Sequence, residues 1–215
     1  MDITGKIIGY DPGGNSKHGV AEFIYKKGNL VSFKVATCET ANDVLDFIGN
    51  LDNLIAVGVD TLTCWSTGPS GWRPADRLLK KNYTVISNSI ASANSLYGSM
   101  GLNGMSVLLS LKDTKTNLHI SETHPKVLYY ALENKKYNYS LNHKEMDELL
   151  SKRLNTEINT KNDHEWDAVV SVYAVLQGLR GQWETDLHAL QKEKNERVIS
   201  PCGKTHYWWP ELMTL

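Results

Sequence analysis

The segment Ile7-Ile8-Gly9-Tyr10-Asp11 is the most informative in the sequence, because a short apolar strand runs here directly into a carboxylate. Two further segments end in the same way, Ala56-Val57-Gly58-Val59-Asp60 and Leu118-His119-Ile120-Ser121-Glu122. The first two are typical of buried parallel strands, and the third of a weaker strand nearer a sheet edge. Burying an unpaired carboxylate is costly, so acids in this position need a partner or a metal ion. If the strands are parallel neighbours, the acids meet at the carboxyl edge of the sheet, where open α/β sheets bind ligands.

A fourth acid lies at the start of an apolar helix, in Asn162-Asp163-His164-Glu165-Trp166-Asp167-Ala168. Asp167 falls within the first helical turns, directly before core-facing positions, and shares a helix face with His164 and Asp163. An acid on the buried side of a helix also needs a partner. Asn162 and Glu165 have the spacing of a capping box, so Asp163 is interpreted equally well as a helix cap or as a ligand.

These residues predict a catalytic, metal-binding acidic site built from Asp11, Asp60, Glu122 and Asp167. Hard oxygen ligands of this kind favour Mg²⁺ or Mn²⁺ over zinc. Two such ions about 4 Å apart would activate a water and stabilise the leaving oxygen in a phosphodiester displacement. For His164 we consider four roles, namely a metal contact, a proton shuttle, a residue that orients substrate, and a satisfied core histidine.

The order of elements around the first strand is also readable. A hairpin is expected from His18 to Ala36, with its turn at Lys26-Lys27-Gly28-Asn29, followed by a helix that Thr40 caps. We predict one domain over residues 1–215, with a helical insertion around 74–112 and a C-terminal extension from about residue 183. The charged segment 185–197 is expected to form an exposed helix.

Bulk properties exclude several classes of protein. The chain has 215 residues, and its formal charge of −1 provides no global basic field, which argues against a general DNA-coating protein. Cys38, Cys64 and Cys202 are too few and too far apart for a disulfide framework or a zinc site. The sequence shows neither a signal-peptide pattern nor an apolar run long enough for a membrane helix. We therefore expect a cytoplasmic protein with reduced thiols.

Two motifs resemble a known superfamily. Ile8-Gly9-Tyr10-Asp11-Pro12-Gly13 before a hairpin is similar to the first motif of RNase H-like nucleases, especially RuvC-type resolvases, and His164-Glu165-Trp166-Asp167-Ala168 is similar to their last motif. The motifs between them resemble the predicted nuclease family called domain of unknown function 429, in the right order over roughly residues 6 to 180. These motifs are Val59-Asp60, Gly71-Trp72-Arg73-Pro74-Ala75-Asp76-Arg77, Met100-Gly101 and Glu122-Thr123-His124-Pro125.

The resemblance implies an α/β fold, an RNase H-like mixed five-stranded sheet with its first three strands antiparallel and helices on its flanks. Asp11 and Asp60 would then lie on adjacent strands, with Glu122 next along and Asp167 packed across them. Arg73 matches a family position at the rim of the site, where it is expected to contact a phosphate. Tyr10 and Thr61 depart from the smaller or apolar residues expected beside the acids.

The leading hypothesis is a divalent-metal-dependent nuclease that hydrolyses phosphodiester bonds in nucleic acid. An ATP-binding module of the actin and sugar-kinase type is an alternative, since residues 11–14 resemble its phosphate hairpin, but Asp60-Thr61 lacks the glycines of a second phosphate loop. A second alternative is a non-catalytic nucleic-acid-binding protein, in which Trp65, Trp72 and Tyr207-Trp208-Trp209 stack on bases. The same aromatic residues are also expected to pack into a core.

Overall fold

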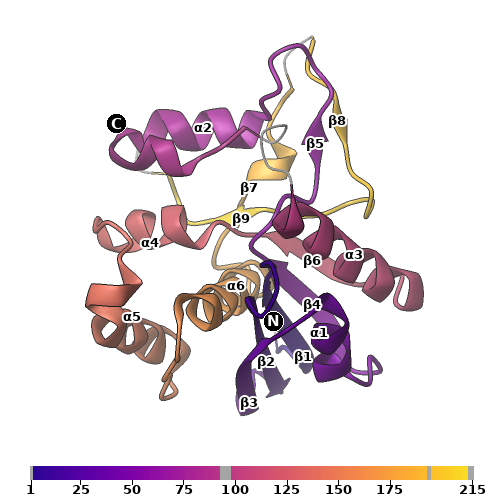
Figure 1. Cartoon of the computed structure of the whole chain (residues 1–215), viewed down its shortest axis with the longest axis vertical. Helices are drawn as coiled ribbons and strands as arrows, with labels where there is room; N and C mark the ends of the chain where they lie inside the picture. Colours follow the sequence, from indigo (N-terminus) through magenta and orange to yellow (C-terminus); the bar gives the residue numbers. More distant parts are fainter. Residues whose placement is uncertain (1, 93–97, 193–194, 213–215) are drawn as a thin grey trace.

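A mixed five-stranded sheet forms the centre of the molecule, in the order β3-β2-β1-β4-β6 (Figure 1). The computed structural model describes residues 2–92, 98–192 and 195–212. Strands β1 (Gly5–Asp11), β2 (His18–Lys26) and β3 (Asn29–Cys38) pair antiparallel in succession. Strands β4 (Leu54–Val59) and β6 (His119–Glu122) continue the sheet parallel to β1. The predicted α/β fold, a mixed five-stranded sheet with its first three strands antiparallel, is confirmed.

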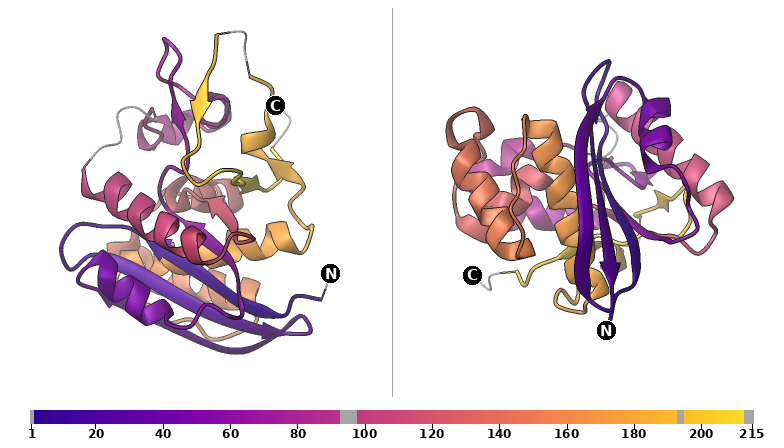
Figure 2. Two further views of the ribbon diagram at one scale, coloured as in Figure 1. Left: turned by 90° about the vertical axis from the view of Figure 1, so that its right-hand side faces the viewer. Right: turned by 90° about the horizontal axis from the view of Figure 1, so that it is seen from below.

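Helices cover both faces of this sheet. Helix α6 (Asp163–Leu179) packs against β1, β2 and β4, with α5 (Tyr139–Leu154) and α4 (Pro125–Glu133) packed against α6. Helices α1 (Ala41–Ile48) and α3 (Ser99–Thr114) lie on the opposite face. Figure 2 (right) shows the sheet edge-on between these two groups of helices. In the described part of the chain, no helix is long and apolar enough to cross a membrane.

Short elements surround the carboxyl edge of the sheet. Helix α2 (Pro74–Asn82) and the 3₁₀ segment η1 (Thr84–Ser89) come between β4 and α3. Near the C-terminus, β7 (Thr185–Asp186) pairs with β9 (Trp208–Trp209). The remaining short elements are β5 (Trp65–Ser66), which pairs with β8 (Val198–Ile199), and the 3₁₀ turn η3 (Leu187–Ala189).

The C-terminal segment differs from the expected exposed helix. Residues 185–192 begin with β7 and η3, because the carboxylate of Asp186 accepts hydrogen bonds from the backbone N–H groups of His188 and Tyr207 and so ties a local turn to a distant strand. Of the C-terminal aromatic residues, Tyr207 and Trp209 are almost completely buried. The helix prediction was therefore wrong for residues 185–192 and 195–197, while residues 193–194 lie outside the described part of the chain. For Tyr207 and Trp209 the core interpretation holds.

Strand alternation divides the buried side chains between two cores. On β1, Ile8 and Tyr10 point into the core beneath α1 and α3, and Val57 and Val59 on β4 join them. Ile7, on the other face of β1, belongs to the core beneath α6. The odd-numbered residues of β1 therefore face α6, and so do the even-numbered residues of β4.

Three strand glycines allow α6 to approach the sheet backbone. A Cβ atom at Gly9 would lie 1.9 Å from the carbonyl oxygen of Ala168, and one at Gly58 would lie 2.2 Å from that of Ser171. On β2, a Cβ atom at Gly19 would lie 1.9 Å from the carbonyl oxygen of His164. No side chain larger than hydrogen fits at these positions, so the helix lies directly on the sheet.

We predict that Gly58→Ala destabilises the protein by about 1–3 kcal/mol, the usual cost of forcing extra atoms into a packed interior. The added methyl group would push α6 outward, so the affinity for divalent ions should fall as well. Urea unfolding and a metal titration measure the two effects. Ser32→Ala, on the exposed face of β3, is the control and should be neutral. Unchanged stability in Gly58→Ala would contradict the close packing of α6.

Candidate metal centre

Three of the four predicted acids meet at the carboxyl edge of the sheet. Asp11 ends β1, Asp60 directly follows β4, and Asp167 lies in the first turns of α6. One carboxylate oxygen from each lies within 4.8 Å of the other two. Asp11 and Asp167 are buried, and Asp60 is partly exposed. We call these three residues the acidic cluster.

Local structure explains why these acids converge. Asp11 continues the face of β1 that carries Ile7 and Gly9 toward α6, and the N–H of Asp60 donates to the carbonyl oxygen of Tyr10, at 2.9 Å. The parallel neighbours β1 and β4 therefore end side by side, and Asp11 and Asp60 lie on the same face of the sheet.

The start of α6 is set by its cap. The side chain of Asn162 accepts a hydrogen bond from the N–H of Glu165 at 3.0 Å, while Glu165 accepts one from the N–H of Lys161 at 2.8 Å. Asn162 is therefore the N-cap, and Asp163 lies in the first helical turn. Starting the helix here brings Asp167, one turn later, over the ends of β1 and β4.

Burial and mutual repulsion disfavour the charged forms of the cluster. Burial raises the pKa of Asp60 and Asp167 well above the usual range, and the neighbouring carboxylates raise them further. Burial also raises the pKa of Asp11, although a hydrogen bond to His164 opposes this rise. Two like charges about 4–5 Å apart repel by about 3–4 kcal/mol at the effective dielectric constant of a protein. A cation among the three carboxylates would relieve this repulsion.

The donor set fits a hard divalent cation. Oδ1 of Asp167 is buried and makes no hydrogen bond of ordinary geometry in the described part of the chain, where the Tyr137 hydroxyl is its neighbour. Buried polar atoms are rarely left poorly paired, and such an atom leaves room for an ion or a water. The three carboxylates supply only oxygen ligands, which suits Mg²⁺ or Mn²⁺.

His164 joins the cluster through Asp11. Its Nδ1 lies 2.7 Å from Oδ2 of Asp11, and this hydrogen bond raises the pKa of the imidazole. Its Nε2 lies 3.9 Å from a carboxylate oxygen of Asp163. The side chain is 28% exposed. His164 is thus a partly accessible residue fixed by a cluster acid, and the core-histidine interpretation does not hold.

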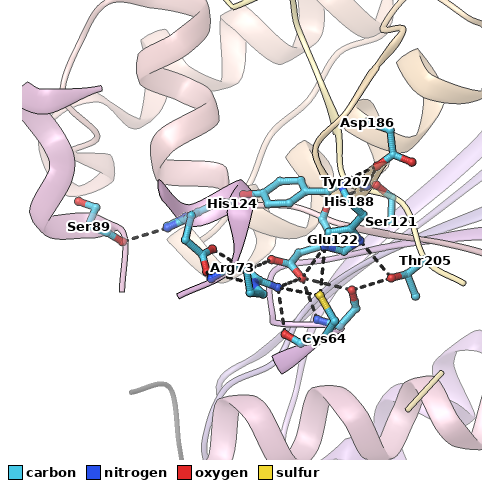
Figure 3. A network of polar contacts seen from close by, with 12 residues as sticks. Cys64, Arg73, Ser89, Ser121, Glu122, His124, Asp186, His188, Thr205 and Tyr207 are labelled. Carbon is cyan, nitrogen blue, oxygen red and sulfur yellow. Dashed lines mark hydrogen bonds and ion pairs between the residues drawn. The ribbon is translucent and has the colours of Figure 1, made fainter. Parts of the chain in front are cut away.

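Glu122 does not join the acidic cluster, contrary to expectation. Its carboxylate accepts two hydrogen bonds from the guanidinium of Arg73, at 2.6 and 2.8 Å (Figure 3). It accepts another from the N–H of Thr63 at 2.8 Å. His188 lies 3.5 Å from the same carboxylate. These positive charges outweigh burial and hold the pKa of Glu122 far below its usual range.

Strand alternation is the reason for this separation. In the register of β4 and β6, Glu122 pairs with Val59 and Ile120 with Val57, and these partners point away from α6. The next residue, Thr123, points toward α6, where its hydroxyl lies 2.7 Å from that of Ser171. An acid one residue further along would have entered the cluster.

Arg73 is not positioned to contact a phosphate at the rim. It is 2% exposed, and its Nε and Nη2 donate to the carboxylate of Asp76 at 2.9 and 2.7 Å. Nη1 donates to the carbonyl oxygen of Cys64 in addition to Glu122, so the described partners engage every nitrogen of the guanidinium. Arg73 instead links α2 to the end of β6.

A second group of metal-type ligands surrounds this arginine. Ligand atoms of Cys64, Glu122 and His188 also lie within 4.8 Å of one another. However, Nη1 of Arg73 is 3.3 Å from the sulfur of Cys64 and hydrogen bonded to Glu122, so a permanent positive charge already occupies the space between them. We therefore do not assign a cation to this group.

Sequence reasoning missed two residues beside the acidic cluster. Burial raises the pKa of all three cluster acids, and the charge of Lys126, the second residue of α4, opposes that rise at each. Tyr137 has a buried hydroxyl beside Asp167, and burial together with the charge of Asp167 raises the pKa of this hydroxyl, so it stays protonated. The position of Lys126 immediately after Glu122-Thr123-His124-Pro125 was a usable signal. Tyr137 lies in the connection between α4 and α5, where no sequence pattern indicated a role in the site.

Comparison with known proteins adds a structural likeness. No family model matches the sequence, and no curated protein matches it. Among solved structures, RuvC of Thermus thermophilus is similar, at 12% sequence identity and a TM-score of 0.45, over 82% of this chain and 96% of that chain. The resemblance to domain of unknown function 429 stays a prediction.

We predict that Arg73→Met costs about 3–5 kcal/mol in stability, because it leaves the buried carboxylates of Glu122 and Asp76 without their cation. Divalent ions should still stabilise this variant, since the acidic cluster is separate from the network. Urea unfolding with and without Mg²⁺ measures both. Lys135→Met, which removes an exposed ion pair with Glu145, is the control and should change stability little. Loss of the Mg²⁺ effect in Arg73→Met would contradict the separation.

We predict that Asp60→Asn is more stable than the unmodified protein at pH 8 in EDTA. Because the pKa of Asp60 is higher in the folded than in the unfolded state, folding favours its protonated form, and stability decreases as pH rises from about 4 toward the folded-state pKa. Each pKa unit by which the folded and unfolded states differ changes the unfolding free energy by about 1.4 kcal/mol. The advantage of Asp60→Asn should therefore narrow at pH 5 and reverse in Mg²⁺.

Urea unfolding between pH 5 and pH 8 measures the difference in unfolding free energy between Asp60→Asn and the unmodified protein. Asp46→Asn, an exposed acid on α1, is the matched control and should show no such pH dependence. A lower stability of Asp60→Asn at pH 8 in EDTA would contradict the electrostatic description of the cluster.

Proposed function

We propose that this protein is a divalent-metal-dependent nuclease, a hydrolase of phosphodiester bonds in nucleic acid. The observation that carries the proposal is the convergence of Asp11, Asp60 and Asp167 at the carboxyl edge of the sheet, where one carboxylate oxygen from each lies within 4.8 Å of the other two. The motif resemblance to RNase H-like nucleases and to domain of unknown function 429 supports the same activity. We propose the cytoplasm as its location.

The three acids would hold Mg²⁺ or Mn²⁺, with two ions as the expected number. Such ions lower the pKa of water and offset the negative charge that develops on a phosphate under attack. Glu122 lies outside this ligand set, because Arg73 holds its carboxylate.

The surrounding residues prepare the site for this chemistry. Asp11 fixes the ring of His164 through Nδ1, which leaves Nε2 as the ring atom that takes up or gives a proton at the edge of the site. Burial of Asp11 and Asp167 limits access of water to one side of the cluster, and partly exposed Asp60 marks the side from which substrate approaches.

The alternatives receive less support from the structure. The buried positions of Tyr207 and Trp209 remove these two aromatic residues from a base-stacking surface. An actin-type nucleotide site needs phosphate contacts after β4, whereas the loop there carries Thr63, whose N–H and hydroxyl bind Glu122.

We predict that Mg²⁺ or Mn²⁺ raises the unfolding free energy, by about 2.7 kcal/mol at a hundred times the dissociation constant, because the ions bind only the folded cluster. The same ions should support cleavage in a screen of single-stranded, duplex, hybrid and branched substrates. Asp167→Asn should lose the stabilisation and reduce cleavage by about 100-fold or more, since even outer partners of metal ligands contribute 10- to 100-fold.

Asp46→Asn makes the same chemical change on the exposed surface of α1 and is the control for both measurements. Cleavage that persists in Asp167→Asn would assign the activity to another site or to a contaminant. Metal binding without cleavage of any substrate would reject the nuclease assignment while leaving the metal centre in place.

A further inference from the structure

A groove runs along the surface beside the acidic cluster. Its walls come from η1, the first turn of α4, the connection from α4 to α5, and the residues that precede α6, and its volume is about 820 Å³. A smaller pocket of about 270 Å³ adjoins it and has Asp60 in its lining. The two hollows share Ser89 and Lys126, so they form one path past the cluster. We call them the long groove and the inner pocket.

The long groove is positively charged. Lys126, Lys136 and Lys161 line it, against a single carboxylate, that of Asp163. All three lysines are exposed, and in the described part of the chain no ion pair engages their ε-amino groups. Unpaired lysines along a groove provide the attraction that a phosphate backbone requires.

The inner pocket has the opposite charge. Asp60, Asp76 and Glu122 line it together with Arg73 and Lys126, but the guanidinium of Arg73 already binds two of these carboxylates. Acidic side chains thus outnumber basic ones where divalent cations are expected, and lysines outnumber acids along the approach. An approaching polyanion would be attracted by the lysines before it reached the acids.

Aromatic side chains add a surface on which bases can stack. Tyr137 and Tyr139 both line the long groove and are partly exposed. The ring of Tyr137 packs at a steep angle against buried Trp166, with 5.6 Å between ring centroids, and the ammonium group of Lys126 lies over it, 5.5 Å from its centroid. The hydroxyl of Tyr139 donates to the carbonyl oxygen of Thr160. Both rings are therefore held in place. Stacking on such rings contributes about 1–3 kcal/mol per base.

The size of the inner pocket discriminates between strand structures. Its volume is near the lower end of that of small-molecule sites, which are about 300–1,000 Å³. A single base or sugar fits this space, but a base that remains paired in a duplex cannot enter it. Access to tyrosine ring faces likewise requires unpaired bases.

We propose that the long groove and the inner pocket bind one unpaired strand of nucleic acid, with phosphates on Lys126, Lys136 and Lys161 and one nucleotide in the inner pocket beside Asp60. The assignment rests on the proposed function for the chemistry at the cluster, while strand binding itself depends on the groove. Since the lysines contact phosphates, the groove accepts DNA and RNA alike.

The test measures binding of fluorescently labelled 16-nucleotide strands of DNA and of RNA, and of the corresponding duplexes, by anisotropy in Ca²⁺ at several salt concentrations. The double variant Lys136→Gln/Lys161→Gln should bind single strands about 10-fold more weakly. The slope of log K against log salt should become shallower by about 1.4, at about 0.7 per lost phosphate contact on a single strand. Duplexes should bind more weakly than single strands to the unmodified protein.

The control is Lys26→Gln/Lys152→Gln, which changes the net charge equally at two exposed lysines outside the groove. It should bind as the unmodified protein does. An equal loss of affinity in the control, or duplex binding as tight as single-strand binding, would overturn the proposal.

Cleavage assays in Mg²⁺ separate this proposal from the proposed function. Cleavage that is unaffected in Lys136→Gln/Lys161→Gln would overturn the groove assignment and leave the nuclease assignment standing. Strand binding that depends on the two lysines, without metal-dependent cleavage, would support the groove and overturn the nuclease assignment.

Discussion

The close approach of α6 to the sheet is the constraint on which the site depends. Gly9, Gly19 and Gly58 remove the side chains that would otherwise separate helix and sheet backbones, and the helix rests on the ends of three neighbouring strands. With a conventional separation, Asp167 would stand several ångströms further from Asp11 and Asp60. The stability of the interface between α6 and the sheet therefore has to offset the repulsion of three carboxylates that it brings together.

The same edge of the sheet holds a second group of buried charges, which differs from the acidic cluster because a cation of the chain itself neutralises it. Around Arg73, the carboxylates of Asp76 and Glu122 are neutralised within the chain, whereas around Asp167 they are not. A buried, internally paired network links α2 and β6, and His188 brings the C-terminal segment into it. This difference separates a structural ion network from a site prepared for an external cation, although both lie at strand ends and both contain acids.

Much of the fold and part of the site could be predicted from the sequence. The apolar approaches to Asp11 and Asp60 identified the strands, and the hairpin between residues 18 and 36 required only local turn chemistry. Glu122 was placed in the cluster because its strand ends in an acid, but alternation along Leu118, Ile120 and Glu122 already assigns it to the opposite face from Asp60. That signal was present in the sequence once the register between β4 and β6 was considered.

Other features depend on partners that no local pattern reveals. Arg73 looked like a phosphate contact because an arginine near acids at a rim commonly has that role. Its burial follows from Asp76 and Glu122, which are 3 and 49 residues away along the chain. The charged segment after residue 184 looked helical, but the carboxylate of Asp186 accepts hydrogen bonds from the backbone N–H groups of Tyr207 and His188, and a short strand and a 3₁₀ turn form there instead. In both cases a long-range hydrogen bond outweighs local preference.

Charge distribution, not net charge, determines how the site would attract the proposed substrate. A formal charge of −1 argues against a protein that coats DNA, yet it is compatible with an acidic cluster whose approach carries unpaired lysines. Electrostatic attraction between exposed charges is screened within about 10 Å at 0.1 M salt, so a polyanion responds to the groove it enters and not to the chain as a whole. Lys126 lies where the two regions meet, lining both hollows and reducing the pKa rise of every cluster acid. Because the proposed strand would compete with the carboxylates for the charge of Lys126, the binding of divalent ions and of a strand at this position should reinforce each other.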